Sequence, residues 1–190
     1  MKLHATRLDG LWEIESSPYR DERGEFRRVF CAQAFESIRP QLRFVQVNQS
    51  DTRRAGTVRG MHLQRAPAAE CKLVRCVRGR VFDVAVDVRP ESPTYLRWHG
   101  VELDEHGERE LFIPEGFAHG FQALTDDARL VYLVTAPWTP QAECGVRFDD
   151  PAVGIDWPLP VIGVSPRDAS HPLLAATASR PAIPTASASR

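Results

Sequence analysis

The sequence predicts an all-β fold in which antiparallel strands form a sandwich or barrel. Between residues 43 and 134, short runs of strand-like residues are separated by turns rich in Gly, Pro, Asp or Arg. No amphipathic stretch there is long enough to be the crossover helix that parallel strands require. A length of 190 residues suits one domain with a sizeable core.

The chain before this region is expected to contribute two strands and one short helix. Residues 8–16 and 25–30 have strand-like composition and flank a polar turn. Residues 31–38 have helix-like spacing, with Phe35 on the apolar side, and Pro40 ends the helix. We expect this helix to cover the sheet.

A second short helix is expected near the C-terminus. Ser165 is a good N-cap, Pro166 occupies the first helical position and Asp168 follows three residues after the cap. Residues 175–190 lack aromatic side chains and are rich in Ala, Ser and Pro, which predicts a disordered tail. The predicted domain is therefore residues 1–174.

Composition limits the partners and the location of the protein. A net charge of −1, from 24 basic and 25 acidic residues, provides no field that would attract nucleic acid or an anionic membrane. The N-terminal residues contain no apolar run typical of a signal peptide or membrane span. Four cysteines without CxxC spacing fit buried thiols in a reducing cytoplasm and do not indicate zinc.

The central stretch of residues 56–87 carries the best candidates for acid/base chemistry. In a strand of residues 58–64, alternation places His62 on one face and Arg59 on the other. Lys72 begins the next strand, and Asp83 lies on the strand after it. From spacing alone, His62 could be structural, Lys72 could keep its ammonium in water, and Asp83 could face a pocket or solvent.

A second informative stretch, LFIPEGFAHGFQA at residues 111–123, contains His119 after a tight turn. With His62, Glu70 and neighbouring glycines, it resembles the two-part signature of the cupin jelly roll. Metal-binding cupins have a His-x-His pair in the first part, but here Gln64 stands at the second position. Because imidazole donors supply most of the affinity of such sites, no functional metal is expected.

Five motifs in order carry a closer resemblance. RGMHLQ, KLVRCVRGRVFDVAVDVRPESPTY, IPEGFAHGFQAL, RFDDPAVGIDWP and VSPRD are similar to the dTDP-4-dehydrorhamnose 3,5-epimerase family, from about Thr6 to Leu174. The resemblance implies a double-stranded β-helix, or cupin-like jelly roll, with a few short helices. It also implies a cofactor-free homodimer that inverts carbon 3, carbon 5 or both of dTDP-4-dehydro-6-deoxy-D-glucose, a dTDP-linked 4-keto-6-deoxyhexose, in dTDP-L-rhamnose or related deoxysugar biosynthesis.

The resemblance assigns catalytic roles that suit the residue types. His62 would be the general base, because imidazole titrates near neutral pH. Lys72 would stabilise the negative charge that develops on the ketone oxygen, and Tyr132 would donate the proton. Asp168 would orient His62, although it could instead complete a helix capping box, and Asp83 is the competing carboxylate. If the resemblance failed, Tyr132 would be a core aromatic.

The resemblance also assigns the nucleotide-binding and sugar-binding residues: Arg23, Phe26, Gln46, Asn48, Arg59, His119, Trp138, Glu143 and Arg167. Arg23 and Arg59 would pair with the diphosphate. For Arg59 to reach the pocket, the strand must bulge near Gly60, or the side chain must reach round the strand end or serve a partner subunit. Trp138 replaces the tyrosine that stacks on the thymine ring in the family, and indole should stack as well.

Two departures from the family bear on the substrate. Arg28 stands where the best-known members have a Glu that contacts the ligand, and Arg167 stands where many have Lys. Three alternatives therefore stay open: an epimerase of carbon 3 only on a related nucleotide deoxysugar, a non-catalytic cupin that binds sugar nucleotides, and a metal-dependent cupin dioxygenase. The N-terminal strands are expected to complete the sheet or site of the partner subunit.

Overall fold

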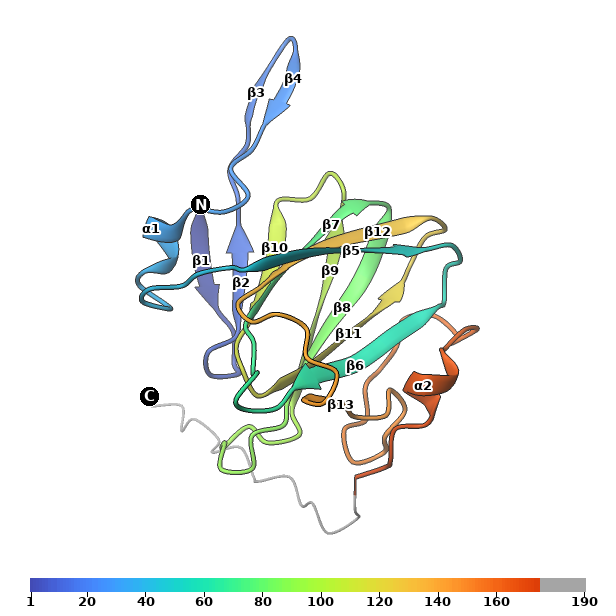
Figure 1. Cartoon of the computed structure of the whole chain (residues 1–190). Helices are drawn as coiled ribbons and strands as arrows, with labels where there is room; N and C mark the ends of the chain where they lie inside the picture. Colours follow the sequence, from blue (N-terminus) through green and yellow to red (C-terminus); the bar gives the residue numbers. More distant parts are fainter. Residues whose placement is uncertain (175–190) are drawn as a thin grey trace, which may run out of the picture.

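A computed structural model describes residues 1–174, in which two antiparallel sheets face each other (Figure 1). In spatial order the first sheet contains β1 (Lys2–Ala5), β2 (Trp12–Glu15), β10 (Arg109–Ile113), β7 (Lys72–Arg78), β12 (Ala128–Val134) and β5 (Gln46–Thr52). The second contains β13 (Glu143–Gly145), β6 (Val58–Gln64), β11 (Phe117–Ala123), β8 (Arg80–Asp87) and β9 (Trp98–Asp104). All ladders between these strands are antiparallel, so the predicted all-β jelly roll is confirmed.

The remaining elements lie outside the two sheets. β3 (Tyr19–Asp21) and β4 (Gly24–Phe26) form a hairpin that stands clear of the sandwich (Figure 1). The strand expected over residues 25–30 is therefore mostly wrong, because its only paired part belongs to this hairpin. The covering helix is confirmed but shorter than expected, as α1 (Ala32–Phe35), and it buries Phe35 completely.

The second predicted helix is α2 (Pro166–Ala169), which lies beside β6 (Figure 1). Its start is as the sequence predicts, because the Ser165 hydroxyl accepts a hydrogen bond from the Asp168 backbone N–H at 3.0 Å. The predicted disordered tail, residues 175–190, lies outside the described residues.

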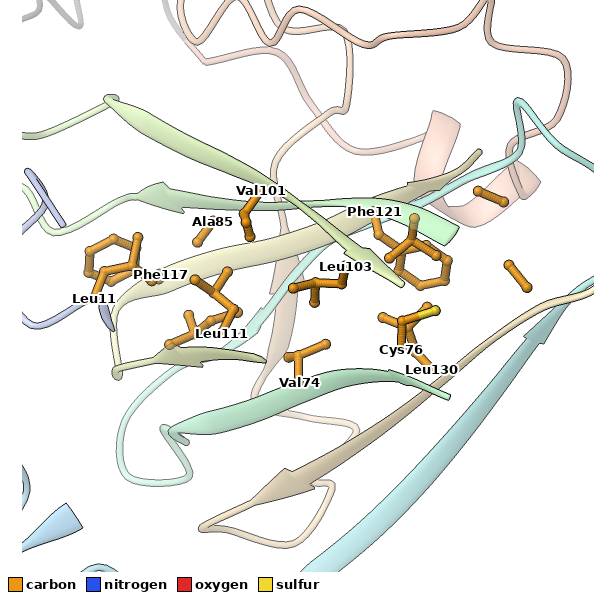
Figure 2. Packing of buried hydrophobic residues seen from close by; sticks show 14 of the residues in the cluster. Leu11, Val74, Cys76, Ala85, Val101, Leu103, Leu111, Phe117, Phe121 and Leu130 are labelled. Carbon is orange, nitrogen blue, oxygen red and sulfur yellow. The ribbon is translucent and has the colours of Figure 1, made fainter. Parts of the chain in front are cut away.

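Apolar side chains from both sheets fill the interior. Figure 2 shows Val74 and Leu111 of the first sheet packing towards Val101, Phe117 and other side chains of the second. Burying each such side chain contributes about 1.5–3 kcal/mol. Two further apolar clusters pack against the outer faces of the sheets, although the outer face of the first sheet stays open to solvent at Val47 of β5 and Val77 of β7.

The cysteines form no disulfide in the described chain. Cys71 and Cys76 are buried as expected, whereas Cys31, which precedes α1, and Cys144, on the edge strand β13, are only partly buried. No helix of residues 1–174 is long and apolar enough to cross a membrane.

Candidate active site

A cavity of about 550 Å³ opens between the two sheets. His62 and His119 line it from the second sheet, and Lys72 and Tyr132 line it from the first. A smaller space of about 90 Å³ adjoins it and shares His62, Lys72 and Tyr132 as lining residues. The cavity is thus bordered by titratable side chains from opposite walls of the sandwich.

Strand register explains why these polar side chains point inward. Tyr132 lies opposite Val74, a core residue, and Lys72 is two residues before Val74 on the same face of β7. On the other sheet, His62 lies opposite His119, which is next to the core residue Ala85. The inner face is therefore apolar at the centre of the sandwich and becomes polar at the cavity.

His62 and Asp168 form a hydrogen-bonded pair at the cavity wall. The His62 Nε2 atom lies 2.7 Å from Asp168 Oδ1, and the Gly60 N–H donates to Asp168 Oδ2 at 3.1 Å. Asp168 is 4% exposed, whereas the His62 side chain is 31% exposed towards the cavity. The Ser165 hydroxyl caps the helix through the Asp168 N–H, but the Asp168 carboxylate binds His62 and the Gly60 N–H, so only half of the capping box is formed.

The environment of Asp168 keeps its carboxyl ionised. Burial raises the pKa of Asp168, but the hydrogen bonds from His62 and the Gly60 N–H outweigh burial and hold that pKa below its usual value. An ionised Asp168 accepts a hydrogen from Nε2 of His62, which leaves Nδ1 as the proton-accepting nitrogen of a neutral ring.

Asp83 does not contact His62 but pairs with the other cavity histidine. Asp83 Oδ1 lies 2.9 Å from His119 Nε2, and Asp83 is fully buried. Its Oδ2 atom has no hydrogen-bond partner within residues 1–174. Each cavity histidine therefore has its own carboxylate, and the structure brings Asp168 rather than Asp83 to His62.

Lys72 is held inside the cavity wall and does not extend into water. It is 7% exposed, and its Nζ lies 3.3 Å from Glu70 Oε1 and donates to the His62 carbonyl oxygen at 3.4 Å. The ammonium thus reaches from the first sheet to the backbone of the second. A buried, fixed cation of this kind can stabilise an anion that forms beside it.

Tyr132 packs against the core while lining the cavity. Burial and the negative charge of Glu70 raise the pKa of Tyr132, and the positive charge of Arg59 offsets only part of this effect. The phenol is therefore protonated at neutral pH and is able to donate.

A bulge in β6 brings Arg59 to the cavity. Pairing with β11 advances three residues on β6, from Arg59 to His62, but only two on β11, from Phe121 to His119. Arg59 and His62 consequently both line the cavity despite the alternation that sequence spacing predicts. Of the routes proposed for Arg59, the bulge near Gly60 is the one present.

Glu143 joins the polar groups at the mouth of the cavity. Its Oε2 accepts from Trp138 Nε1 at 2.7 Å and pairs with the Arg167 guanidinium at 2.6 Å. Nearby on β5, the Gln46 side-chain amide donates to Asn48 Oδ1 at 2.7 Å, and both residues line the smaller space. The predicted binding residues of strands β5 and β6, of β13 and of α2 therefore gather at one site.

The structure does not bring Arg23 and Phe26 to this cavity. Both lie on the β3–β4 hairpin, where the Arg23 guanidinium pairs with Asp21 at 2.6 Å. Phe26 is 73% exposed, and Arg28 follows the hairpin and is also exposed. Within one chain, Arg23, Phe26 and Arg28 are therefore absent from the residues that line the site.

The residues at the cupin metal positions are committed to other contacts. The Gln64 amide donates to the carbonyls of Ala68 and Pro137 and to Glu70, while His119 binds Asp83. The Gln64 side chain is thus engaged in holding loops together, and the donor set lacks the second imidazole that metal-binding cupins use. These residues do not fit the metal centre of that fold.

Sequence reasoning missed His171, whose ring centroid lies 6.1 Å from that of His62. The available signal was its position just after α2, three residues beyond Asp168, which keeps it close to Asp168 in space.

Comparisons with known proteins agree with this geometry. The sequence model of the family described as dTDP-4-dehydrorhamnose 3,5-epimerase matches residues 5–176. The chain belongs to the dTDP-4-dehydrorhamnose 3,5-epimerase family. A family member of that name from Methanothermobacter thermautotrophicus is 48% identical over 157 residues, covering 83% of this chain and 84% of the relative.

Relatives with other names also match this chain. A relative from Streptomyces niveus named dTDP-4-dehydrorhamnose 3-epimerase is 41% identical and is matched over 97% of this chain and 89% of its own. Among solved structures, a dTDP-6-deoxy-D-glucose-3,5-epimerase from Legionella pneumophila, in complex with dTDP-4-keto-L-rhamnose, has a TM-score of 0.84 and 40% identity. That match covers 90% of this chain and 92% of the other.

Proposed function

We propose that this protein inverts carbons 3 and 5 of dTDP-4-dehydro-6-deoxy-D-glucose, as a step in dTDP-L-rhamnose or related deoxysugar biosynthesis. The observation that carries the proposal is the arrangement of one cavity, with His62 of one sheet, paired with Asp168 of α2, on one wall and Lys72 and Tyr132 of the other sheet on the opposite wall. Inversion requires a base and an acid on opposite faces of a sugar ring. Two facing sheets can supply them.

In this mechanism His62 removes the proton. Carbons 3 and 5 both flank the ketone at carbon 4, so a proton on either becomes removable when the resulting enolate is stabilised. Asp168 accepts the Nε2 hydrogen of His62, and the free Nδ1 takes the proton from carbon. As the imidazolium forms, the charge of Asp168 stabilises it.

Lys72 and Tyr132 complete the reaction. The Lys72 ammonium stabilises the enolate oxygen, which is common to both inversions. The protonated Tyr132 then delivers a proton to the opposite face of the ring, and solvent restores both groups. His119 lines the same cavity, and because its Nε2 is paired with Asp83, its Nδ1 is free to accept a hydrogen bond from a sugar hydroxyl.

The binding groups would hold the nucleotide at the cavity mouth. Arg59 and Arg167 supply guanidinium groups for the diphosphate, and Trp138, 57% exposed, offers an indole face for the thymine. Gln46, Asn48 and Glu143 supply hydrogen bonds around the sugar and nucleoside.

A homodimer would bring the remaining binding residues, Arg23 and Phe26, to a cavity. Arg23 and Phe26 lie on a hairpin that stands clear of its own sandwich, with Tyr19 and Phe26 67% and 73% exposed. We propose that this hairpin covers the cavity of the partner subunit, where Arg23 meets the diphosphate. Residues 1–174 would act as one epimerase domain in each subunit, and the free cysteines support a cytoplasmic location.

Deuterium exchange tests the proposal directly. The protein is incubated with dTDP-4-dehydro-6-deoxy-D-glucose in deuterated water, and the sugar is analysed by NMR. Incorporation at carbons 3 and 5 together with inversion is expected. Absence of exchange at both positions would contradict an epimerase and favour a protein that only binds sugar nucleotides.

An epimerase of carbon 3 alone is the second candidate. The Streptomyces niveus relative, named a 3-epimerase, supports it, because its identity of 41% is close to that of relatives named 3,5-epimerases. Arg28 is the position at which a different sugar or nucleotide preference could arise. Exchange confined to carbon 3 in the same experiment would select this candidate.

A further inference from the structure

His171 occupies space beside the proposed base. A side chain added at Gly145 would meet the His171 Nε2 atom at 2.3 Å, so the ring fills the place of the missing side chain. Gly145 lies directly opposite His62 in the β13–β6 ladder, and side chains of such a pair share a face. The absence of a side chain at position 145 therefore makes room for a second imidazole next to His62.

This second imidazole has an uncommitted nitrogen. The Nε2 atom of His171 is buried and has no hydrogen-bond partner within residues 1–174. A buried nitrogen of this kind is normally satisfied by a protein group, a water or an ion.

Together His62, Asp168 and His171 form a group of metal donors. One donor atom from each residue lies within 4.8 Å of the other two. Two imidazoles and a carboxylate are the ligands of many zinc sites, in which donor atoms about 2.0–2.2 Å from the ion lie about 3.4 Å apart. To bind an ion, His62 Nε2 and Asp168 Oδ1 must separate slightly from 2.7 Å, and the His171 ring must move towards them. Asp168 is already fixed by the Gly60 N–H on its other oxygen, which leaves Oδ1 as the donor.

We propose that His62, Asp168 and His171 bind Zn²⁺, and that zinc binding inhibits the enzyme reversibly. The ion would replace the hydrogen between His62 Nε2 and Asp168 Oδ1. This site differs from the cupin metal centre, since it uses neither Gln64, Glu70 nor His119.

Inhibition follows from the proton balance of His62. In the free enzyme Nε2 carries the hydrogen and Nδ1 is the acceptor. When zinc binds Nε2, the hydrogen moves to Nδ1 and the ring stays neutral, so no net proton is released. Nδ1, the nitrogen that would remove the proton from the substrate, is then already protonated, so His62 cannot act as the base. This last step depends on the proposed epimerase function, whereas zinc binding does not.

Calorimetry of the chelator-treated protein with ZnCl₂ tests the binding. We expect His171→Ala and His171→Asn to weaken the site by about tenfold or more, a change of about 1.4 kcal/mol. His106→Ala is the matched control, because His106 has a side chain that is 90% exposed and lies outside the group, so its affinity should equal that of the parent. Thermal unfolding checks that the variants are folded.

Zinc should also stop deuterium exchange in the parent, and EDTA should restore it. The inhibitory zinc concentration should rise in the His171 variants in parallel with the dissociation constant. Equal affinity in the parent and both His171 variants, or binding without inhibition of an active parent, would overturn the inference. If the metal-free parent shows no exchange, the proposed function has failed, and calorimetry still decides whether the zinc site exists.

Discussion

The hydrogen bond between His62 and Asp168 is the residue-scale feature on which the proposed chemistry depends. Replacement by His62→Asn should abolish measurable exchange, and Asp168→Asn should lower kcat by about 10²–10⁴, the usual contribution of acid/base catalysis. Binding of dTDP should remain, because neither side chain is a phosphate donor. Calorimetry with dTDP and NMR-monitored exchange measure the two effects separately; equal loss of both would point to misfolding.

Tyr132 provides a sharper test of two-sided catalysis. In Tyr132→Phe, His62 can still remove a proton and return a deuteron to the same face, but no donor remains on the opposite wall. We therefore expect exchange without inversion, with the ring configuration followed by proton couplings in the NMR spectrum. Full inversion by the variant would show that another group or water delivers the proton.

Glu110, which lies outside the active site, should make the stability of the protein depend on pH. Burial raises its pKa to about 7, and the nearby Arg75, at 3.0 Å, offsets only part of that rise. Below pH 4.5, the usual pKa of Glu, the Glu110 carboxyl is protonated in both the folded and the unfolded protein. Between pH 4.5 and pH 7 it stays protonated only in the folded protein. Protonation of Glu110 therefore contributes fully to the free energy of unfolding at low pH. This contribution, about 3 kcal/mol, is lost as the pH rises to 7.

The variant Glu110→Gln should remove this loss. Urea unfolding of parent and variant at pH 5 and pH 8 gives the difference directly, because other titrating groups cancel between the two proteins. We expect the variant to gain stability relative to the parent at pH 8. A difference that is independent of pH would mean that Arg75 keeps Glu110 ionised.

At the scale of the element, the bulge in β6 decides which side chains share the cavity. Gly60 has a φ of +130°, and a Cβ there would lie 2.5 Å from the Gly120 Cα. Gly60→Ala should therefore lower the free energy of unfolding by about 3 kcal/mol or more, through both strain and the clash. The measurement is urea unfolding, with exchange activity lost in parallel as Arg59 and His62 separate.

Gly24 supplies the matched control for this prediction. Its φ is +124°, but no atom lies within 4 Å of an added Cβ. Gly24→Ala should thus cost only the backbone strain of about 1–3 kcal/mol. An equal loss of stability in the two variants would show that the close approach of β6 to β11 does not add to the cost of a side chain at position 60.

The same strand shows what sequence can and cannot predict. Alternation identified β6 and the inward side of His62, because the period of a strand is fixed by its backbone. It placed Arg59 on the wrong face, since the bulge depends on contact with Gly120 of a strand far along the chain. His171 was missed for a similar reason, as its room is provided by Gly145 on another strand.

At the scale of the whole molecule, the family resemblance named residues that one chain cannot assemble. The motifs correctly predicted which residues share the cavity where those residues lie on packed strands of the sandwich. Arg23 and Phe26 are absent from that group, since the hairpin that carries them stands apart from the sandwich (Figure 1). Their position is explained if the functional unit contains two chains.

Mixing two inactive variants tests this dimer. A chain with His62→Asn keeps an intact hairpin, and a chain with Arg23→Ala keeps an intact cavity. If the hairpin of one subunit completes the site of the other, each hybrid dimer contains one complete site. Random exchange of subunits makes half of the dimers hybrids, so about a quarter of the parental activity should return. Hybrid formation is checked with two differently tagged chains, and hybrids without activity would place Arg23 at the cavity of its own chain.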